Sequence, residues 1–303
     1  MCVGHVALDM MFGVQAFPTH PTKTPAHQHQ QGVGGMSANA AVALARLGGH
    51  VAFCGPVGDD AAADVFERHF KREGVDVQRM QRLGGHSSSV SAIIIDGQGE
   101  RMIFNHRGSA LTANAPLDVQ CLAGCQALWV DPRCPAWALQ ALQWARANGV
   151  PSMLDGDISP AQDLTALVPW ADWVVFSEAG LVNSYGVGGE AGLDRALQAD
   201  ANGRAPLAVA QTLGANGVCW KRAGQALMRQ PAWAVGPVVD TLGAGDVFHA
   251  ALGLALWEGM DDVQAMRWAC AAAALKCLRP HGILGAPSRA EVMAFLAQAS
   301  PAV

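Results

Sequence analysis

Short apolar runs alternate with longer helix-permissive segments along most of the chain. Four of the short runs, 127–131, 151–154, 173–176 and 207–212, are predicted as buried strands. Between the first two lies segment 136–148, whose apolar residues suit a helix that Gly149 ends. Repetition of strand, helix and strand predicts a parallel sheet covered by helices, which is an α/β fold.

Two segments interrupt this repetition. Residues 12–33 are polar and contain several prolines. Residues 90–96 and 101–106 alternate as strands do, and the glycine-containing turn 97–99 between them predicts a hairpin.

An aspartate follows a glycine-rich turn in segment 240–250, Asp-Thr-Leu-Gly-Ala-Gly-Asp-Val-Phe-His-Ala. Gly243 and Gly245 let the backbone turn tightly, so that successive N–H groups can point at an anion. The apolar run 247–257, with Gly259 as its stop, predicts a helix directly behind this turn, and the helix adds its positive end.

Asp246 falls in the first turn of that helix. A carboxylate there can take the proton of an attacking hydroxyl, while the N–H groups hold the charge of a transferred phosphoryl group. The alternative is an aspartate that only caps a helix, behind glycines that only make a turn.

A second glycine segment, Gly-Gly-Met-Ser-Ala-Asn at 34–39, precedes an alanine-rich run. We predict a helix with Ser37 as its N-cap and Gly48 as its stop. The apolar run 51–57 and the polar Gly-Asp-Asp at 58–60 follow.

Together these segments resemble the ribokinase-like (PfkB) carbohydrate kinases, which carry a glycine pair followed by Asn and, near the other end, Asp-Thr-x-Gly-Ala-Gly-Asp. Gly4, Asp9 and segments 212–217 and 279–282 match as well. The resemblance implies one domain over 1–303, a three-layer α/β/α sandwich with a small β-sheet lid from about 10–35 and 86–108. It also implies a homodimer joined through the lid.

The resemblance assigns roles to single positions. Asp246 matches the general base, and the backbone of Gly243, Ala244 and Gly245 matches the anion hole. The positions that match sugar-binding residues are Asp9, Gly35 and Asn39, and those that match the ATP-binding region are Ser177, Thr212, Gly214 and Gly217. For Asp9 and Asn39 the alternatives are a turn residue and an inert helix residue.

Metal positions follow from the same resemblance. Asp240 and the loop 282–286 match the region that holds a monovalent cation such as K⁺. The family's Asn-x-x-Glu motif, which organises Mg²⁺ near ATP, is replaced by Ser177-Glu178-Ala179-Gly180. We therefore expect Glu178 to act on Mg²⁺ through water, since magnesium keeps several of its waters.

The branch that contains 6-deoxy-6-sulfofructose kinase is similar at 154–158, 176–178, 243–249 and 274–280. Its sulfonate pocket corresponds to Lys23, Asn105 and Arg133, and two cations with an amide suit an anion. The alternative for Lys23 and for Arg133 is an ordinary solvated residue at the surface.

Composition narrows the function classes. A net charge of −5 and the absence of a basic run argue against nucleic-acid binding. Eight cysteines without a Cys-x-x-Cys pair indicate reduced thiols and a cytoplasmic location, and no apolar run reaches the ~20 residues of a membrane span. His27, His29 and His249 are interpreted as lid, packing or substrate-edge residues rather than a metal site.

Other nucleotide motifs fit poorly. A P-loop motif is absent, and the loose dinucleotide fingerprint at 186–191 does not follow a strand directly. The sequence predicts an ATP-dependent kinase acting on a primary hydroxyl of a ketose with an anionic far end. The alternatives are a fructokinase-like or nucleoside kinase and, from another class, a catalytically weak sugar-sensing protein; a dehydrogenase is a third hypothesis.

Overall fold

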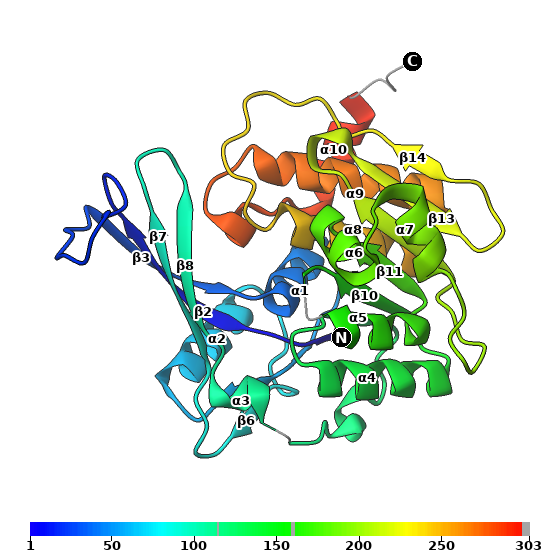
Figure 1. Cartoon of the computed structure of the whole chain (residues 1–303), viewed down its shortest axis with the longest axis horizontal. Helices are drawn as coiled ribbons and strands as arrows, with labels where there is room; N and C mark the ends of the chain where they lie inside the picture. Colours follow the sequence, from blue (N-terminus) through cyan, green and yellow to red (C-terminus); the bar gives the residue numbers. More distant parts are fainter. Residues whose placement is uncertain (114, 159–160, 299–303) are drawn as a thin grey trace.

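The computed structural model describes residues 1–113, 115–158 and 161–298. An eight-stranded sheet lies at its centre (Figure 1). In spatial order its strands are β14 (Met228–Gln230), β13 (Val218–Arg222), β12 (Ala208–Thr212), β11 (Trp173–Phe176), β10 (Ser152–Gly156), β9 (Leu128–Val130), β1 (Cys2–Val3) and β4 (Phe53–Cys54). The strands from β12 to β4 are parallel, β13 runs antiparallel to β12, and β14 runs antiparallel to β13. The four predicted buried strands are confirmed.

Helices cover both faces of this sheet, with a separate apolar core on each side. One side carries α1 (Met36–Arg46), α2 (Ala61–Arg72), α8 (Ala244–Trp257), α9 (Asp262–Cys277) and α10 (Arg289–Gln298). The other carries α4 (Pro135–Asn148), α5 (Ala161–Leu167), α6 (Glu178–Tyr185) and α7 (Gly189–Ala196). Because strand side chains alternate, Trp129 enters the first core while Leu128 and Val130 enter the second. The predicted three-layer sandwich is confirmed.

A second, four-stranded sheet stands beside the main body (Figure 1). Its order is β3 (Gln28–Gly34), β2 (Ala7–Gly13), β7 (Ser89–Ile95) and β8 (Arg101–His106). We call it the small sheet. The predicted hairpin is its β7–β8 pair, which turns through Gly99 at φ 85°.

Short elements complete the described chain. β5 (Pro56–Gly58) pairs with β6 (Gln81–Leu83), and α3 (Ser109–Thr112) follows the small sheet. Single 3₁₀ turns lie at Val119–Leu122, Val168–Trp170, Gly214–Asn216 and Gly282–Gly285. Among the described helices, none is long and apolar enough to cross a bilayer.

Three predicted helix ends are confirmed and one predicted helix start is wrong. Gly48, at φ 94°, follows the end of α1. Gly149 ends α4 in the left-handed conformation, and Gly259, at φ 90°, follows the end of α8. Ser37 is not the N-cap of α1, because Gly35 takes that position and the helix begins at Met36. The Ser37 hydroxyl lies instead 2.6 Å from Asp131 Oδ2, a buried acceptor that the local sequence does not reveal.

Candidate active site

The parallel strands end at one edge of the sheet, so the residues that follow them gather there. Asp131 follows β9, Asp157 follows β10, Ser177 follows β11, and Thr212 is the last residue of β12. Hydrogen bonds link neighbours along this edge, since Ser177 Oγ donates to Asp157 Oδ1 at 2.8 Å and Thr212 Oγ1 donates to the Phe176 carbonyl at 3.3 Å.

Asp246 lies at the same edge, in the first turn of α8, whose N-cap is Gly243 at φ 78°. Asn39 of α1 donates from Nδ2 to Asp246 Oδ2 at 2.7 Å. The two glycine segments, far apart in sequence, therefore meet through these side chains. N–H groups in the first turn of a helix have no acceptor within the helix, so they face the space in front of α8.

Burial raises the pKa of Asp246 to about 7, and repulsion from Asp155 acts in the same direction. The hydrogen bond from Asn39 and the attraction of His249 oppose this rise, and Asp157 adds a further, weaker repulsion. A carboxyl group with this pKa is largely ionised just above neutral pH and holds a proton well, as a general base must.

Behind Asp246 lies a buried pair of ionisable groups. His249, one turn along α8, places Nδ1 2.8 Å from Oδ2 of Asp155, the fourth residue of β10. Burial raises the pKa of Asp155 against the attraction of His249. Burial alone would lower the pKa of His249, but the combined attraction of Asp155, Asp246 and Asp157 raises it. Sequence analysis assigned His249 to packing or a substrate edge and gave Asp155 no role.

The structural requirement for glycine differs between positions 243 and 245 of the predicted anion turn. Gly243 needs its positive φ to start the helix. Gly245 has no positive φ, and a Cβ built on it meets nothing within 4 Å. Neither packing nor backbone conformation therefore demands glycine at position 245. The N–H of Ala244, by contrast, already donates to the Thr241 carbonyl at 3.1 Å.

A buried aspartate that sequence analysis did not select holds the start of α1. Asp131 Oδ2 accepts the N–H groups of His5 at 2.7 Å and Ser37 at 3.0 Å, and its Oδ1 accepts the N–H of Arg133 at 2.8 Å. Three chain segments are thereby fixed around one carboxylate. Its sequence signal is a charged residue directly after an apolar strand.

The small sheet contributes a polar row. Asp9, Ser91 and Asn105 are in register on β2, β7 and β8, so their side chains share one face. Asn105 Nδ2 donates to Ser91 Oγ at 3.1 Å. Burial raises the pKa of Asp9, against a hydrogen bond from Ser91. The Asp9 carboxylate lies against Gly34, so a Cβ at position 34 would displace it.

Of the three residues of the predicted anion pocket, Lys23 lies far from the polar row, whereas Asn105 belongs to it. Lys23 is exposed in the connection between β2 and β3, beyond the Gly13–Gln28 pair at the far end of the small sheet from Asp9. Arg133 lies at the main sheet edge, where its guanidinium is 3.7 Å from Asp157 Oδ2.

A second arginine lies beside Arg133. Arg107 donates to the main-chain oxygen of Arg133 at 2.6 Å. Burial lowers the pKa of His5 to about 4 against the attraction of Asp131, and both arginines add to the lowering. Sequence analysis missed Arg107, although it directly follows the predicted hairpin.

The altered magnesium motif has a packing reason. Ser177 is the N-cap of α6 and accepts the Gly180 N–H at 2.9 Å, and Glu178 is exposed in the first turn. A Cβ at position 180 would overlap the Gly156 carbonyl oxygen. The family's glutamate therefore does not fit this backbone at 180.

The predicted nucleotide turn follows β12. Gly214 begins a 3₁₀ turn at φ 54°, and the Leu213 N–H donates to the Gly217 carbonyl at 2.7 Å. A Cβ at Gly217 would overlap the Gln230 carbonyl oxygen, whereas one at Gly214 meets nothing within 4 Å. Packing thus explains Gly217, and its positive φ explains Gly214.

Residues 1–289 match the pfkB family carbohydrate kinase profile. The chain belongs to this family. A ribokinase from Haemophilus influenzae is 28% identical over 309 residues, which cover 98% of each chain. A ketohexokinase from Mus musculus is 25% identical over 293 residues, covering 91% of this chain and 95% of the relative. The structure of Arabidopsis thaliana ribokinase complexed with ribose and ATP shares the fold, with a TM-score of 0.86 at 22% identity over 98% of both chains.

This pfkB carbohydrate kinase, an enzyme that phosphorylates a hydroxyl group, carries a lysine where the sequence predicts a monovalent cation. Lys276 Nζ lies 2.7 Å from the Asp240 main-chain oxygen and 3.2 Å from its Oδ2. Burial raises the pKa of Asp240, but N–H donors from Leu242 and Gly282 and the Lys276 charge outweigh it and lower the pKa.

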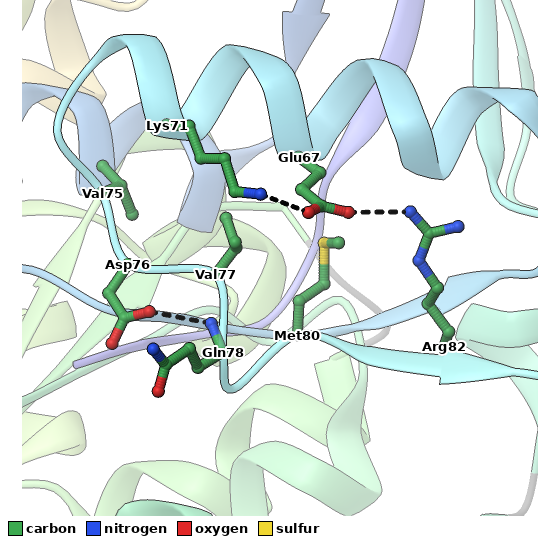
Figure 2. Close-up of a pocket in the computed structure, with 8 residues that line it drawn as sticks. All are labelled: Glu67, Lys71, Val75, Asp76, Val77, Gln78, Met80 and Arg82. Carbon is green, nitrogen blue, oxygen red and sulfur yellow. Dashed lines mark hydrogen bonds and ion pairs between the residues drawn. The ribbon is translucent and has the colours of Figure 1, made fainter.

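Within residues 1–113, 115–158 and 161–298, no group of three or more His, Cys, Asp or Glu side chains is arranged to hold a metal ion. A hollow of about 590 Å³ lies beside α2 (Figure 2). Its Glu67 accepts from both Lys71 and Arg82, so these charges satisfy one another. None of the predicted site residues lines it.

Proposed function

We propose that the protein transfers the γ-phosphoryl group of ATP to a primary hydroxyl of a furanose-form sugar. The observation that carries this proposal is the Asp246 carboxyl group, held by Asn39 at the N-terminus of α8 with its pKa raised to about 7. A base and an anion-binding helix end at one point are the two elements that phosphoryl transfer needs.

In the proposed reaction Asp246 takes the proton of the sugar hydroxyl. The hydroxyl oxygen forms a bond to the γ-phosphorus while the bond between that phosphorus and the bridging oxygen of ADP breaks. First-turn N–H groups of α8, at Gly245 and Asp246, stabilise the charge on the transferred group. The polar row of Asp9, Ser91 and Asn105 and the amide of Asn39 orient the sugar hydroxyls. Gly35, at φ 104° against the His5 carbonyl, starts the helix that carries Asn39 and places its backbone beside the sugar.

We propose that ATP lies along the ends of β11 and β12, near Ser177 and Thr212, and against the turn that runs from Gly214 to Gly217. Mg²⁺ bound to the phosphates would neutralise charge on the β- and γ-oxygens. Asp157 and Glu178 flank Ser177 in this region and suit contacts through magnesium-bound water. Glu178→Gln should therefore raise the KM for Mg-ATP much more than the KM for sugar, and unchanged magnesium dependence would remove Glu178 from this role.

We propose a ketose with an anionic group at its far end, sulfonate or phosphate, as the substrate. Arg133 and Arg107 lie together at the edge of the main sheet, and Asn105 supplies an amide from the small sheet. Two guanidinium groups can replace the hydration of an anion. Lys23 joins them only if the connection between β2 and β3 folds over the sugar.

A neutral sugar is the second candidate. The names of the ribokinase and ketohexokinase relatives favour ribose or fructose, and in that case Arg133 would serve Asp157 alone. A nucleoside is a third acceptor, and a weak sugar sensor is the non-catalytic alternative.

A homodimer through the small sheet is part of the proposal. Phe104 and Met102 of β8, 62% and 40% exposed, lie on the face opposite Asp9 and Asn105. Phe12 of β2 is on the same outer face. An exposed apolar face of this kind suits a second copy of the sheet. We also propose a cytoplasmic location, which the eight free cysteines support.

The test is ADP release from Mg-ATP across neutral ketoses, ribose, sulfofructose, phosphorylated ketoses and nucleosides. Preference for an anionic ketose, lost in Arg133→Gln, supports the substrate proposal; preference for a neutral sugar refutes it. Asp246→Asn should lose about 10²–10⁴-fold in kcat but still bind ligand. Silence of the wild-type protein across the panel would favour the sensor.

A further inference from the structure

One buried lysine fastens the loop that leads into α8. The ammonium of Lys276, in the last turn of α9, has three oxygen acceptors: the Asp240 main-chain oxygen at 2.7 Å, Asp240 Oδ2 at 3.2 Å and the Arg279 main-chain oxygen at 3.5 Å. The side chain is completely buried. Three acceptors match the three N–H donors of an ammonium group, so the buried nitrogen has a partner for each donor.

Asp240 is the centre of this arrangement. Its N–H, like that of Val239, donates to the Cys277 carbonyl at the end of α9. Its carboxylate accepts the N–H of Leu242 at 2.9 Å and of Gly282 at 2.8 Å. The chain from Asp240 to the α8 N-cap is three residues long, so the position of the predicted anion turn depends on these contacts.

The oxygen atoms around this ammonium are of the type that binds a potassium ion, since main-chain carbonyls and a carboxylate suit hard cations. Asp240 and the loop 282–286 are also where the family resemblance predicts such an ion. However, Lys276 already occupies the position against Asp240. A second cation on the same oxygens would be a like charge a few ångströms away in a buried setting, where repulsion is strong. Potassium therefore does not fit the residues present.

We propose that Lys276 is a built-in monovalent cation, which holds the loop before α8 in place and makes phosphoryl transfer independent of K⁺. Lys276 is thus a positioning residue, and its effect on turnover rests on the proposed kinase function. Its place at the C-terminal end of α9 also suits a positive charge, because the helix dipole is negative there.

Wild-type turnover and melting temperature should be the same in potassium, sodium and tetramethylammonium chloride at equal ionic strength. Two variants separate the cation from the side chain. Lys276→Ser opens the space, adds a hydroxyl oxygen and leaves the Asp240 oxygens free for an ion. Lys276→Met fills most of the space without charge, so that no ion can enter.

In tetramethylammonium, we expect Lys276→Ser to lose about 10²-fold in kcat, because the anion turn is displaced. Potassium should restore at least about tenfold of this loss. It should also raise the melting temperature of Lys276→Ser by about 3 °C at tenfold excess over its Kd. Calorimetry with thallous ion, a potassium mimic, should detect one site in Lys276→Ser and none in the wild type or in Lys276→Met.

Lys221→Met is the matched control, because Lys221 pairs with Glu190 and Asp194 outside this loop. It should show the wild-type indifference to cations. Potassium activation or thallous-ion binding of the wild type at this loop would overturn the proposal, as would recovery of Lys276→Ser by every cation alike. If both variants at position 276 fail to fold, the cation dependence and thallous-ion binding of the wild type still test the proposal. If no acceptor is phosphorylated, the proposed function fails, while melting and thallous-ion binding still test the built-in cation.

Discussion

From the raised pKa of Asp246 we predict that kcat/KM rises with pH near neutrality, because the pH dependence of kcat/KM reports ionisations of the free enzyme. With a pKa of about 7, the proposed base is largely protonated in mildly acidic solution. About 1% of it is ionised at pH 5 and about 90% at pH 8, so kcat/KM should rise about 90-fold between these values. An ordinary aspartate, with a pKa near 4, would give an almost flat profile from pH 6 to 8.

Two variants should move this profile in opposite directions. Asn39→Ala removes the amide that donates to Asp246 Oδ2 at 2.7 Å and stabilises the charged form. A hydrogen bond to a charged group contributes about 1.5–3 kcal/mol, so the midpoint should rise by about one pH unit or more.

Asp155→Asn removes a negative charge that repels the ionised base. It also weakens the charge on His249, but the attraction of His249 for Asp246 is smaller than the repulsion from Asp155. The midpoint should therefore fall, by about half a unit. The asparagine keeps an oxygen that can accept from His249 Nδ1, so the packing around α8 is preserved.

The assay is initial-rate measurement of kcat/KM for the best sugar, at saturating Mg-ATP, in one buffer series of constant ionic strength. Ionisation of ATP is common to all variants, so a difference between midpoints belongs to the protein. Identical midpoints in the three proteins, or shifts of the same sign in both variants, would refute the assignment of the titration to Asp246.

Three further outcomes follow from the geometry. Asp246→Asn should raise the melting temperature at pH 8 but not at pH 4. Because the pKa of Asp246 is raised in the folded state, the free energy of unfolding falls as the pH rises from about 4 to 7, and the variant escapes this loss. Equal shifts of the melting temperature at both pH values would contradict the buried charge. Gly245→Ala should keep the wild-type melting temperature and lose phosphoryl transfer. In Gly180→Ala the new Cβ overlaps the Gly156 carbonyl oxygen, so this variant should lose about 3 kcal/mol of stability. A Gly180→Ala variant of wild-type stability would contradict the packing argument. Phe104→Glu should give monomers in light scattering, with Met293→Glu, equally exposed on α10, as the control that changes nothing.

The periodicity of apolar residues and the placement of glycines were sufficient to predict the central sheet and the helices that cover it. The four buried strands were predictable because each lies in a continuous apolar run. The helices before Gly149 and Gly259 were predictable because each apolar run stops at a glycine, and both glycines have positive φ. The encounter of Asn39 with Asp246 was predictable only through the ordered pair of motifs. No local pattern indicates that residues so distant in sequence share a hydrogen bond.

Buried polar partners were the part that sequence could not supply. Ser37 has the residue type of an N-cap, but its hydroxyl turns inward because Asp131 offers an acceptor across the sheet edge. Lys276 sits at the end of an alanine-rich helix, where a lysine is usually solvated. Its burial becomes favourable only when the oxygens of Asp240 and Arg279 are in place.

The distribution of hydrogen-bond donors explains why Asp246, among the carboxylates at this end of the protein, suits the proposed role of base. Asp131 receives N–H groups from three residues, and Asp240 receives two N–H groups and an ammonium. Both carboxylates hold chain segments in place, and the donors around Asp240 lower its pKa. For Asp246, among described residues, the side-chain donor is Asn39, while Asp155 repels it from behind. A carboxylate stabilised so little has a high affinity for a proton, and the fold can keep it in that state because better-satisfied charges on either side fix the turn that carries it.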